Sequence, residues 1–257
     1  MTDHPRDGHI HVLGYQNTAV NFSSGPNAML LHLPGVGMSQ RNFIDTSSCR
    51  NILKDQVDAV TPRTRGGGYG SLGVKSAVVH VFEHDIYTVV LTEDPTLIPS
   101  ALLSVPAHKR PSISRDLVNF YTTRFPGWSI ALCCFDNREA KQAAPLLMWY
   151  TPLESEPGLR LPALDCHTGE VPDVDALVDV DHWVIVSGPD LRMGAPVHYS
   201  DRISPDQRLY LPTEVIGRSF RGRIPNGDFV ISRIALREGY IGVESVSRPN
   251  APSSRSN

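Results

Sequence analysis

The sequence has no long hydrophobic run, few lysines and almost no excess of either charge. Of its 257 residues, 40% are hydrophobic and 20% are charged, and the formal net charge is −3. The longest apolar stretches, residues 128–135 and 145–150, fall far short of the ~20 residues that span a bilayer. The polar N-terminus leads into no apolar signal region, so we expect neither a signal peptide nor a membrane anchor. The composition is that of a soluble globular protein rather than of a disordered, coiled-coil or collagen-like chain.

Cysteine is also scarce, and the four cysteines have no metal-binding or redox spacing. Cys49, Cys133, Cys134 and Cys166 form no C-x-x-C pair, and Cys133 and Cys134 stand next to each other in an apolar run. A free cysteine in such a run behaves as a small hydrophobic residue. We therefore expect reduced, mostly buried thiols in a cytoplasmic protein.

The strongest catalytic signatures are missing. The chain has no G-x-S-x-G, no H-E-x-x-H and no C-x-x-C, which are the common marks of serine hydrolases, zinc peptidases and dithiol redox proteins. Residues 68–73 do spell G-x-G-x-x-G. A dinucleotide-binding fingerprint, however, needs a strand before it and a helix after it, whereas here a helical segment precedes and a valine-rich strand follows. A flexible glycine loop is the favoured interpretation of this segment.

Basic residues are mostly arginine, and they are unevenly placed. The chain has 20 arginines and four lysines; residues 1–187 are acidic on balance, whereas residues 188–257 carry ten arginines against seven acids. This excess is well below a nucleic-acid-binding signature, so nucleic-acid binding is not favoured, although the C-terminal arginines leave it open. Strand alternation puts Arg221 and Arg223 on one face, and with Arg218 they are the candidate anion-binding residues. The simpler interpretation is a solvated outer face.

The pattern of apolar residues predicts an α+β fold with a mixed, mostly antiparallel sheet and three or four short helices in the middle of the chain. A second possibility is a small α/β core over residues 75–190 with a separate β-rich C-terminal piece. The expected helices cover residues 49–60, 95–105, 115–124 and 138–144. The expected strands cover residues 9–13, 19–22, 29–33, 77–82, 86–91, 128–135, 146–150, 183–186, 218–224 and 229–235.

The last two expected strands form a hairpin around residues 225–228, and a long acidic surface loop is expected over residues 154–181. We expect one globular domain over residues 1–246, divisible into an acidic part, 1–187, and a β-rich part, 188–246. Residues 247–257 are expected to be a disordered tail.

One cluster of chemically capable residues lies in the long loop. Asp165, Cys166 and His167 are consecutive, and a thiolate nucleophile needs a base whose tautomer a carboxylate fixes. In an extended chain Cys166 and His167 point to opposite sides, so a partner for the thiol must come from elsewhere, with His182 the first candidate and His80 or His84 the others. A polar turn in which Asp165 bonds backbone amides is the simpler interpretation.

Histidines also suggest a metal site, but the sequence does not identify one. His9 and His11 share one face of a strand, His80 and His84 can share another, and Asp181 precedes His182. Zinc needs three or four ligands that converge in space. The acidic series over residues 173–181 lacks the central glycine and terminal glutamate of a calcium loop. Metal and cofactor therefore stay unknown at this stage.

Two functions of different classes follow from these observations. The first is a binding or interaction protein without catalysis, because no catalytic motif outweighs its simpler explanation. The second is a hydrolase or transferase in which Cys166 or a metal acts, with Asp165, His167, Asp181 and His182 as base, orienting group or ligands. A concave pocket that holds Cys166 or His167 beside a second histidine or carboxylate would favour the enzyme. Partners and oligomeric state are not indicated.

Overall fold

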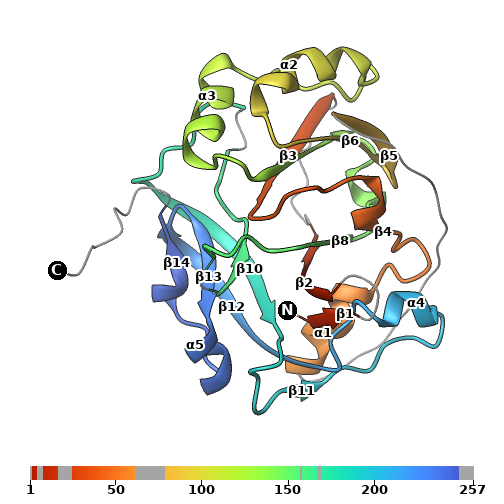
Figure 1. Cartoon of the computed structure of the whole chain (residues 1–257), viewed down its shortest axis with the longest axis vertical. Helices are drawn as coiled ribbons and strands as arrows, with labels where there is room; N and C mark the ends of the chain where they lie inside the picture. Colours follow the sequence, from red (N-terminus) through yellow and green to blue (C-terminus); the bar gives the residue numbers. More distant parts are fainter. Residues whose placement is uncertain are drawn as a thin grey trace.

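The computed structural model describes residues 2–4, 8–16, 25–61, 79–156, 158–166 and 169–248. In this part of the chain the backbone forms four antiparallel sheets and five short α-helices (Figure 1). The α+β class and the mostly antiparallel pairing predicted from the sequence are confirmed. The helices are not restricted to the middle of the chain, because two of them follow residue 200.

Two sheets pack face to face as a sandwich. We call the first the β3 sheet, with the strand order β3 (Pro26–Leu33), β7 (Ser129–Asp136), β6 (Tyr87–Thr92) and β5 (His80–His84). The second is the β8 sheet, with the order β1 (Thr2–His4), β2 (Gly8–Tyr15), β8 (Leu146–Tyr150) and β4 (Phe43–Ile44). The core between them holds alternate side chains from both sheets, among them Leu31, Val89, Cys133 and Met148.

The two continuous apolar runs of the sequence are strands covered on both faces. In β7, Ala131, Cys133 and Phe135 enter the core between the two sheets, while Ile130 and Leu132 face a second core on the other side. All eight residues of β7 are buried. In a strand that is covered on both faces every side chain is buried, so its sequence is an unbroken apolar run. This pattern is what predicted β7.

Helices cover the outer faces of the sandwich. The β3 sheet is covered by α2 (Ile98–Ala101) between the short 3₁₀ turns η2 (Pro95–Leu97) and η3 (Leu102–Ser104), and by α3 (Arg115–Arg124). As predicted, Ser114 caps α3: its hydroxyl accepts the Leu117 N–H at 3.1 Å. On the β8 sheet lie α1 (Ile52–Val60) and residues 199–211, which include α4 (Pro205–Arg208).

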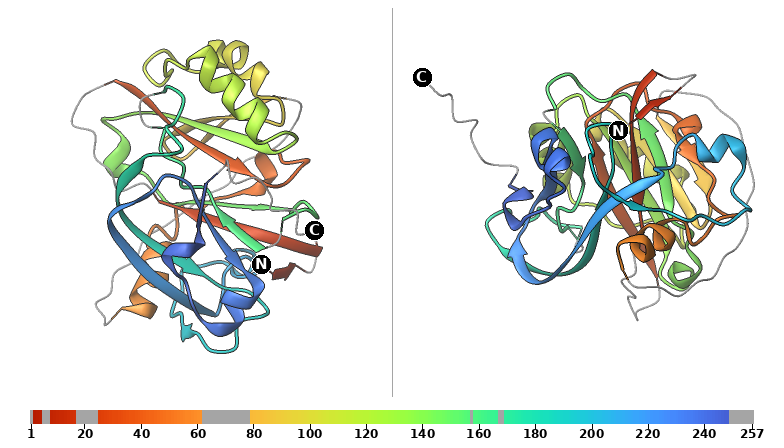
Figure 2. Two further views of the ribbon diagram at one scale, coloured as in Figure 1. Left: turned by 90° about the vertical axis from the view of Figure 1, so that its left-hand side faces the viewer. Right: turned by 90° about the horizontal axis from the view of Figure 1, so that it is seen from below.

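Residues 158–247 build two smaller sheets at the end of the molecule opposite α2 and α3 (Figure 2). One has the order β10 (Leu177–Val186), β12 (Glu214–Pro225) and β11 (Ala195–Pro196). The other, called the β13 sheet below, has the order β14 (Val246–Ser247), β13 (Asp228–Ser232) and β9 (Gly158–Leu161). Together with α5 (Arg233–Glu238) they enclose a core of their own around Phe220, Phe229 and Leu236.

Several local predictions were wrong, and the strand expected over residues 229–235 is one of them, because residues 233–238 form α5. The strands on either side of residues 225–228 do not form a hairpin: β12 pairs with β10 and β11, whereas β13 pairs with β9 and β14. The acidic segment 154–181 is not one loop, because β9 and the start of β10 lie in it. The helix expected over residues 138–144 is only the 3₁₀ turn η4 (Ala140–Gln142). Two further 3₁₀ turns are η1 (Gln40–Asn42) and η5 (Val243–Ser245).

Some expectations lie outside the described residues. They include the strand over 19–22, the glycine loop over 66–73 and all but the first two residues of the tail over 247–257. Among the described helices, none is both long and apolar enough to cross a membrane.

Candidate functional site

The segment that carries Asp165 and Cys166 follows β9 and is held in place by one buried side chain. Asn226, 2% exposed, accepts the backbone N–H of Asp165 at 2.8 Å and donates to the backbone oxygens of Asp165 and Asp173 at 3.4 and 2.9 Å. Leu164 and Cys166 then pack against the core beneath α3. The segment that carries Asp165 and Cys166 is therefore held by hydrogen bonds to its backbone and by apolar packing of its side chains.

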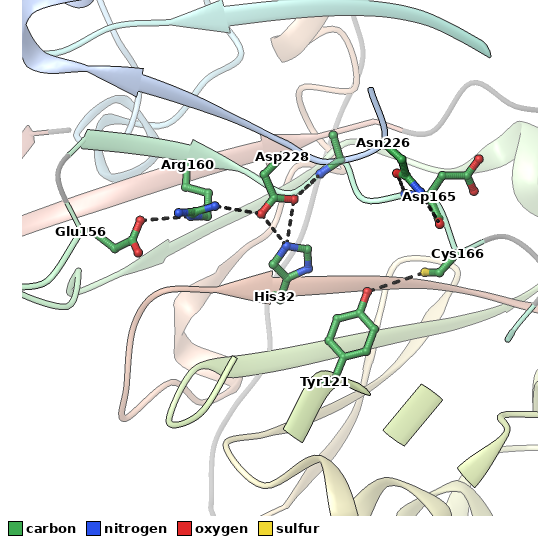
Figure 3. A network of polar contacts seen from close by, with 9 residues as sticks. His32, Tyr121, Glu156, Arg160, Asp165, Cys166, Asn226 and Asp228 are labelled. Carbon is green, nitrogen blue, oxygen red and sulfur yellow. Dashed lines mark hydrogen bonds and ion pairs between the residues drawn. The ribbon is translucent and has the colours of Figure 1, made fainter. Parts of the chain in front are cut away.

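The thiol of Cys166 lies against a phenol. Its Sγ atom is 3.7 Å from the hydroxyl of Tyr121, which projects from α3 and is 1% exposed (Figure 3). Burial raises the pKa of the Cys166 thiol, the hydrogen bond with Tyr121 lowers it to a smaller extent, and the charge of Asp165, the smallest of the three influences, raises it. At neutral pH Cys166 is therefore a protonated thiol, which is a weak nucleophile.

Cys166 also lines a pocket of about 230 Å³. The pocket opens between the start of β3, the segment that leads into α3, and the loop after β9. In the described part of the chain its lining consists of Pro26, Asn27, Ala28, Leu30, residues 111–113, Leu117, Leu132, Cys166 and Gly169. Of these side chains only Cys166 is ionisable. Its lining side chains are mostly apolar, but polar atoms make up more of its exposed wall than apolar atoms do.

A buried histidine–carboxylate pair lies further along β3 than the residues that line the pocket. The Nε2 atom of His32 is 2.9 and 2.8 Å from the two carboxylate oxygens of Asp228, the first residue of β13, and both residues are at most 1% exposed. Because an ionised carboxylate only accepts hydrogen bonds, Nε2 carries the proton of this contact. The contact joins the β3 sheet to the β13 sheet (Figure 3).

The pair continues into a charged network. Arg160 of β9 donates to Asp228 at 3.1 Å and to Glu156 at 3.0 Å, and the backbone N–H of Ala163 donates to Asp228 at 3.1 Å. Burial raises the pKa of Asp228, but His32, Arg160 and the Ala163 N–H together outweigh burial and leave it below its ordinary value. Asp228 is therefore ionised at neutral pH. We call His32, Asp228, Arg160 and Glu156 the buried ionic network.

Aromatic rings shield the buried ionic network from water. The ring of Phe125 stacks on His32 with centroids 4.1 Å apart, and the guanidinium of Arg160 lies 5.2 Å from the ring centre of Trp128. The second ring nitrogen of His32, Nδ1, is buried and has no hydrogen-bond partner among the residues described. A catalytic base must lie within hydrogen-bond reach of the group whose proton it takes. Among the described residues, no such group lies beside Nδ1. The buried ionic network therefore connects the β3 sheet to the β13 sheet and has a structural role.

His182 and His167 do not complete a described dyad with Cys166. His182 lies on β10 opposite Phe220 of β12, and its side chain is exposed. His167 falls outside the residues that the structure describes. In the described part of the chain, the polar partner of the thiol is Tyr121 rather than a histidine or carboxylate. The structure thus brings Cys166 into a pocket without showing a base beside it.

The three candidate arginines are divided between the two faces of β12. Arg218 donates to the backbone oxygen of Ile241 at 2.9 Å and lies over the ring of Phe220 on the inner face. On the outer face, Arg221 pairs with Asp181 at 3.0 Å, and Arg223 donates to the backbone oxygen of Leu177 at 2.9 Å. Asp179 stands directly opposite Arg223. The arginines therefore have protein partners and do not converge on one point.

The histidines that suggested a metal are distributed over several elements. His9 and His11 share a face of β2, with ring centroids 5.8 Å apart, and burial lowers the pKa of His11 to about 3. His80 and His84 lie at the two ends of β5. Within the described ranges, no three histidine, cysteine or acidic side chains gather closely enough to hold a metal ion.

Sequence reasoning identified Asp165 and Cys166 but missed His32, Tyr121, Asn226 and Asp228. A signal for His32 was available, because it is the one polar residue in the apolar run over residues 29–33. Asn226 and Asp228 were interpreted as hairpin-turn residues, which hid their buried roles.

The chain was also compared with models of known protein families, with curated proteins and with solved structures. None of the three comparisons gave a match.

Proposed function

We propose that this protein binds a small ligand in the pocket beside Cys166 and does not catalyse a reaction there. The observation that carries the proposal is the state of the thiol. It lines a pocket of about 230 Å³, yet the described polar group beside it is a phenol, and burial raises its pKa. A catalytic cysteine needs the opposite arrangement, with a lowered pKa and a base within hydrogen-bond reach.

Alkylation of the native protein tests this proposal. Cys49, Cys133 and Cys134 are 3%, 0% and 0% exposed, whereas Cys166 is only partly buried, so iodoacetamide should modify one thiol of four. Because burial raises the pKa of this thiol, its rate at about pH 7 should be at least about tenfold below that of N-acetylcysteine and should rise with pH. Mass spectrometry after proteolysis gives both the site and the rate.

The control is Cys166→Ser, which should lose native labelling while all remaining thiols react after unfolding. A rate that already levels off below about pH 7 would mean a thiolate nucleophile and would favour the alternative, a hydrolase or transferase that acts through Cys166.

The same thiols support a reducing compartment, and we propose the cytoplasm. All four cysteines are free. Protein thiols stay reduced in the cytosol, whereas secreted proteins with an even number of cysteines usually pair them.

A further inference from the structure

We propose that Asn226 is a site of spontaneous deamidation that the fold holds closed, and that its conversion to aspartate or isoaspartate releases the segment that carries Cys166. The inference goes beyond the proposed binding function and does not depend on it. It is carried by the residue that follows Asn226 in the sequence and by the hydrogen bonds of its buried side-chain amide.

Asn226 and Gly227 form the only Asn–Gly pair in the sequence. Glycine has no Cβ, so its backbone nitrogen is the least shielded from the side chain before it. In deamidation this nitrogen loses its proton and attacks the Cγ atom of the asparagine: a C–N bond forms, the Cγ–Nδ2 bond breaks, and ammonia leaves. Water then opens the cyclic imide at either of its carbonyl groups, which gives aspartate or isoaspartate.

The packing requires both members of this reactive pair. The side chain of Asn226 accepts one backbone N–H and donates to two backbone oxygens, a combination that an amide offers and a carboxylate does not. A Cβ atom on Gly227 would lie 2.2 Å from the backbone oxygen of Ser247 in β14, so no larger residue fits without a shift of the backbone. The contacts that hold the Cys166 segment therefore depend on a pair that is chemically unstable.

The folded structure opposes the reaction. Asn226 is 2% exposed, and its amide is fixed by hydrogen bonds to the backbone of Asp165 at 2.8 and 3.4 Å (Figure 3) and of Asp173 at 2.9 Å. Its backbone N–H donates to the oxygen of Ala176 at 3.0 Å. To reach the Gly227 nitrogen, the amide has to turn away from its partners, and water has to enter to open the imide. Deamidation therefore needs a local opening, which costs free energy.

Conversion of Asn226 removes these contacts permanently. An ionised carboxylate only accepts hydrogen bonds, so an oxygen of the new residue would face the backbone oxygens of Asp165 and Asp173. The new negative charge would also be buried, two residues before the buried carboxylate of Asp228. Isoaspartate in addition lengthens the main chain between β12 and β13. In either form the segment around Cys166 loses the side chain that holds it.

Deamidation of the full chain can be followed by mass spectrometry of the tryptic peptide over residues 224–233. Native protein is compared with protein unfolded by urea in the same mildly alkaline buffer. We expect the native protein to react at least about tenfold more slowly, which corresponds to an opening cost of about 1.4 kcal/mol or more. A smaller difference would overturn the proposal, because the fold would then give little protection. An unfolded chain that does not react at this site would overturn it as well.

The release of the segment is tested with Asn226→Asp, which carries one product of the reaction. Iodoacetamide should label Cys166 at least about tenfold faster in this variant than in the unaltered protein, while the other three cysteines, which are at most 3% exposed, stay unlabelled. The matched control is Asn119→Asp, which adds the same charge at an exposed position of α3 and should leave the labelling unchanged.

A smaller increase in Cys166 labelling, or an equal increase in the control, would mean that the conversion does not release the segment, and the inference would be wrong. Labelling of all four thiols would mean that Asn226→Asp unfolds the whole chain, and the local release would again be wrong. Neither outcome bears on the proposed ligand binding, which is tested with the unaltered protein.

Discussion

Replacing Asp228 by Asn should lower the free energy of unfolding by about 3 kcal/mol, the lower end of the range for breaking a buried ion pair. The carboxylate accepts hydrogen bonds from His32, Arg160 and the backbone of Ala163. An amide keeps the shape but turns one of its two acceptors into a donor, which meets the N–H groups of Arg160 or His32. The loss stays at the lower end because Arg160 retains Glu156.

Thermal or urea unfolding measures this effect. For a chain of this length, about 3 kcal/mol corresponds to a fall in Tm of roughly 6–12 °C. The matched control is Asp181→Asn, which removes a carboxylate from the exposed pair with Arg221, where both side chains are more than 70% exposed. Exposed pairs contribute about 0–1 kcal/mol, so the control should unfold almost like the unaltered protein. Equal losses in the two variants would contradict the role of the buried ionic network.

The stability difference between the unaltered protein and Asp228→Asn should disappear in acid. The pKa of Asp228 is lower in the folded protein than in the unfolded chain, where aspartate titrates near 3.9. A group with a lowered pKa stabilises the fold above its unfolded value, and the stabilisation is lost as the pH falls through its folded value. The unaltered protein should therefore lose this advantage below about pH 4.

Urea unfolding at a series of pH values tests this directly. We expect the full difference between the two proteins at neutral pH and a steady decrease below about pH 4, with the lowered stability of Asp228→Asn depending less on pH in that range. A difference that stays constant into strong acid would mean that Asp228 is not ionised in the folded protein. Asp181→Asn again serves as the control, since its carboxylate is exposed.

Elements whose patterns are local could be predicted from the sequence. β7 and β8 were predicted because unbroken apolar runs fit strands covered on both faces, and α3 because Ser114 gives a recognisable N-terminal cap. The prediction of a hairpin around residues 225–228 was wrong because the contacts that decide the structure there are not local. The turn residues are those of a hairpin, but Asn226 and Asp228 make long-range contacts, and the two strands join different sheets.

The candidate site could be predicted only in part. Cys166 was identified because it stands between an aspartate and a histidine, residue types that suit cysteine chemistry, in a segment predicted to be a surface loop. Its partner Tyr121 is 45 residues away on a helix, and the partners His32 and Asp228 are separated by 196 residues. Contacts over such separations depend on how the sheets pack, and no local pattern in a single sequence specifies that.

We propose that Cys166 is a protonated thiol in a binding pocket and not a nucleophile. The most direct measurement is its own titration, taken from the ultraviolet thiolate absorbance of the unaltered protein minus that of Cys166→Ser. We expect no thiolate at about pH 7 and a midpoint above that of free cysteine, because burial raises the pKa of this thiol. A midpoint below about pH 7 would mean that Cys166 is a thiolate under these conditions and would make it a candidate catalytic residue.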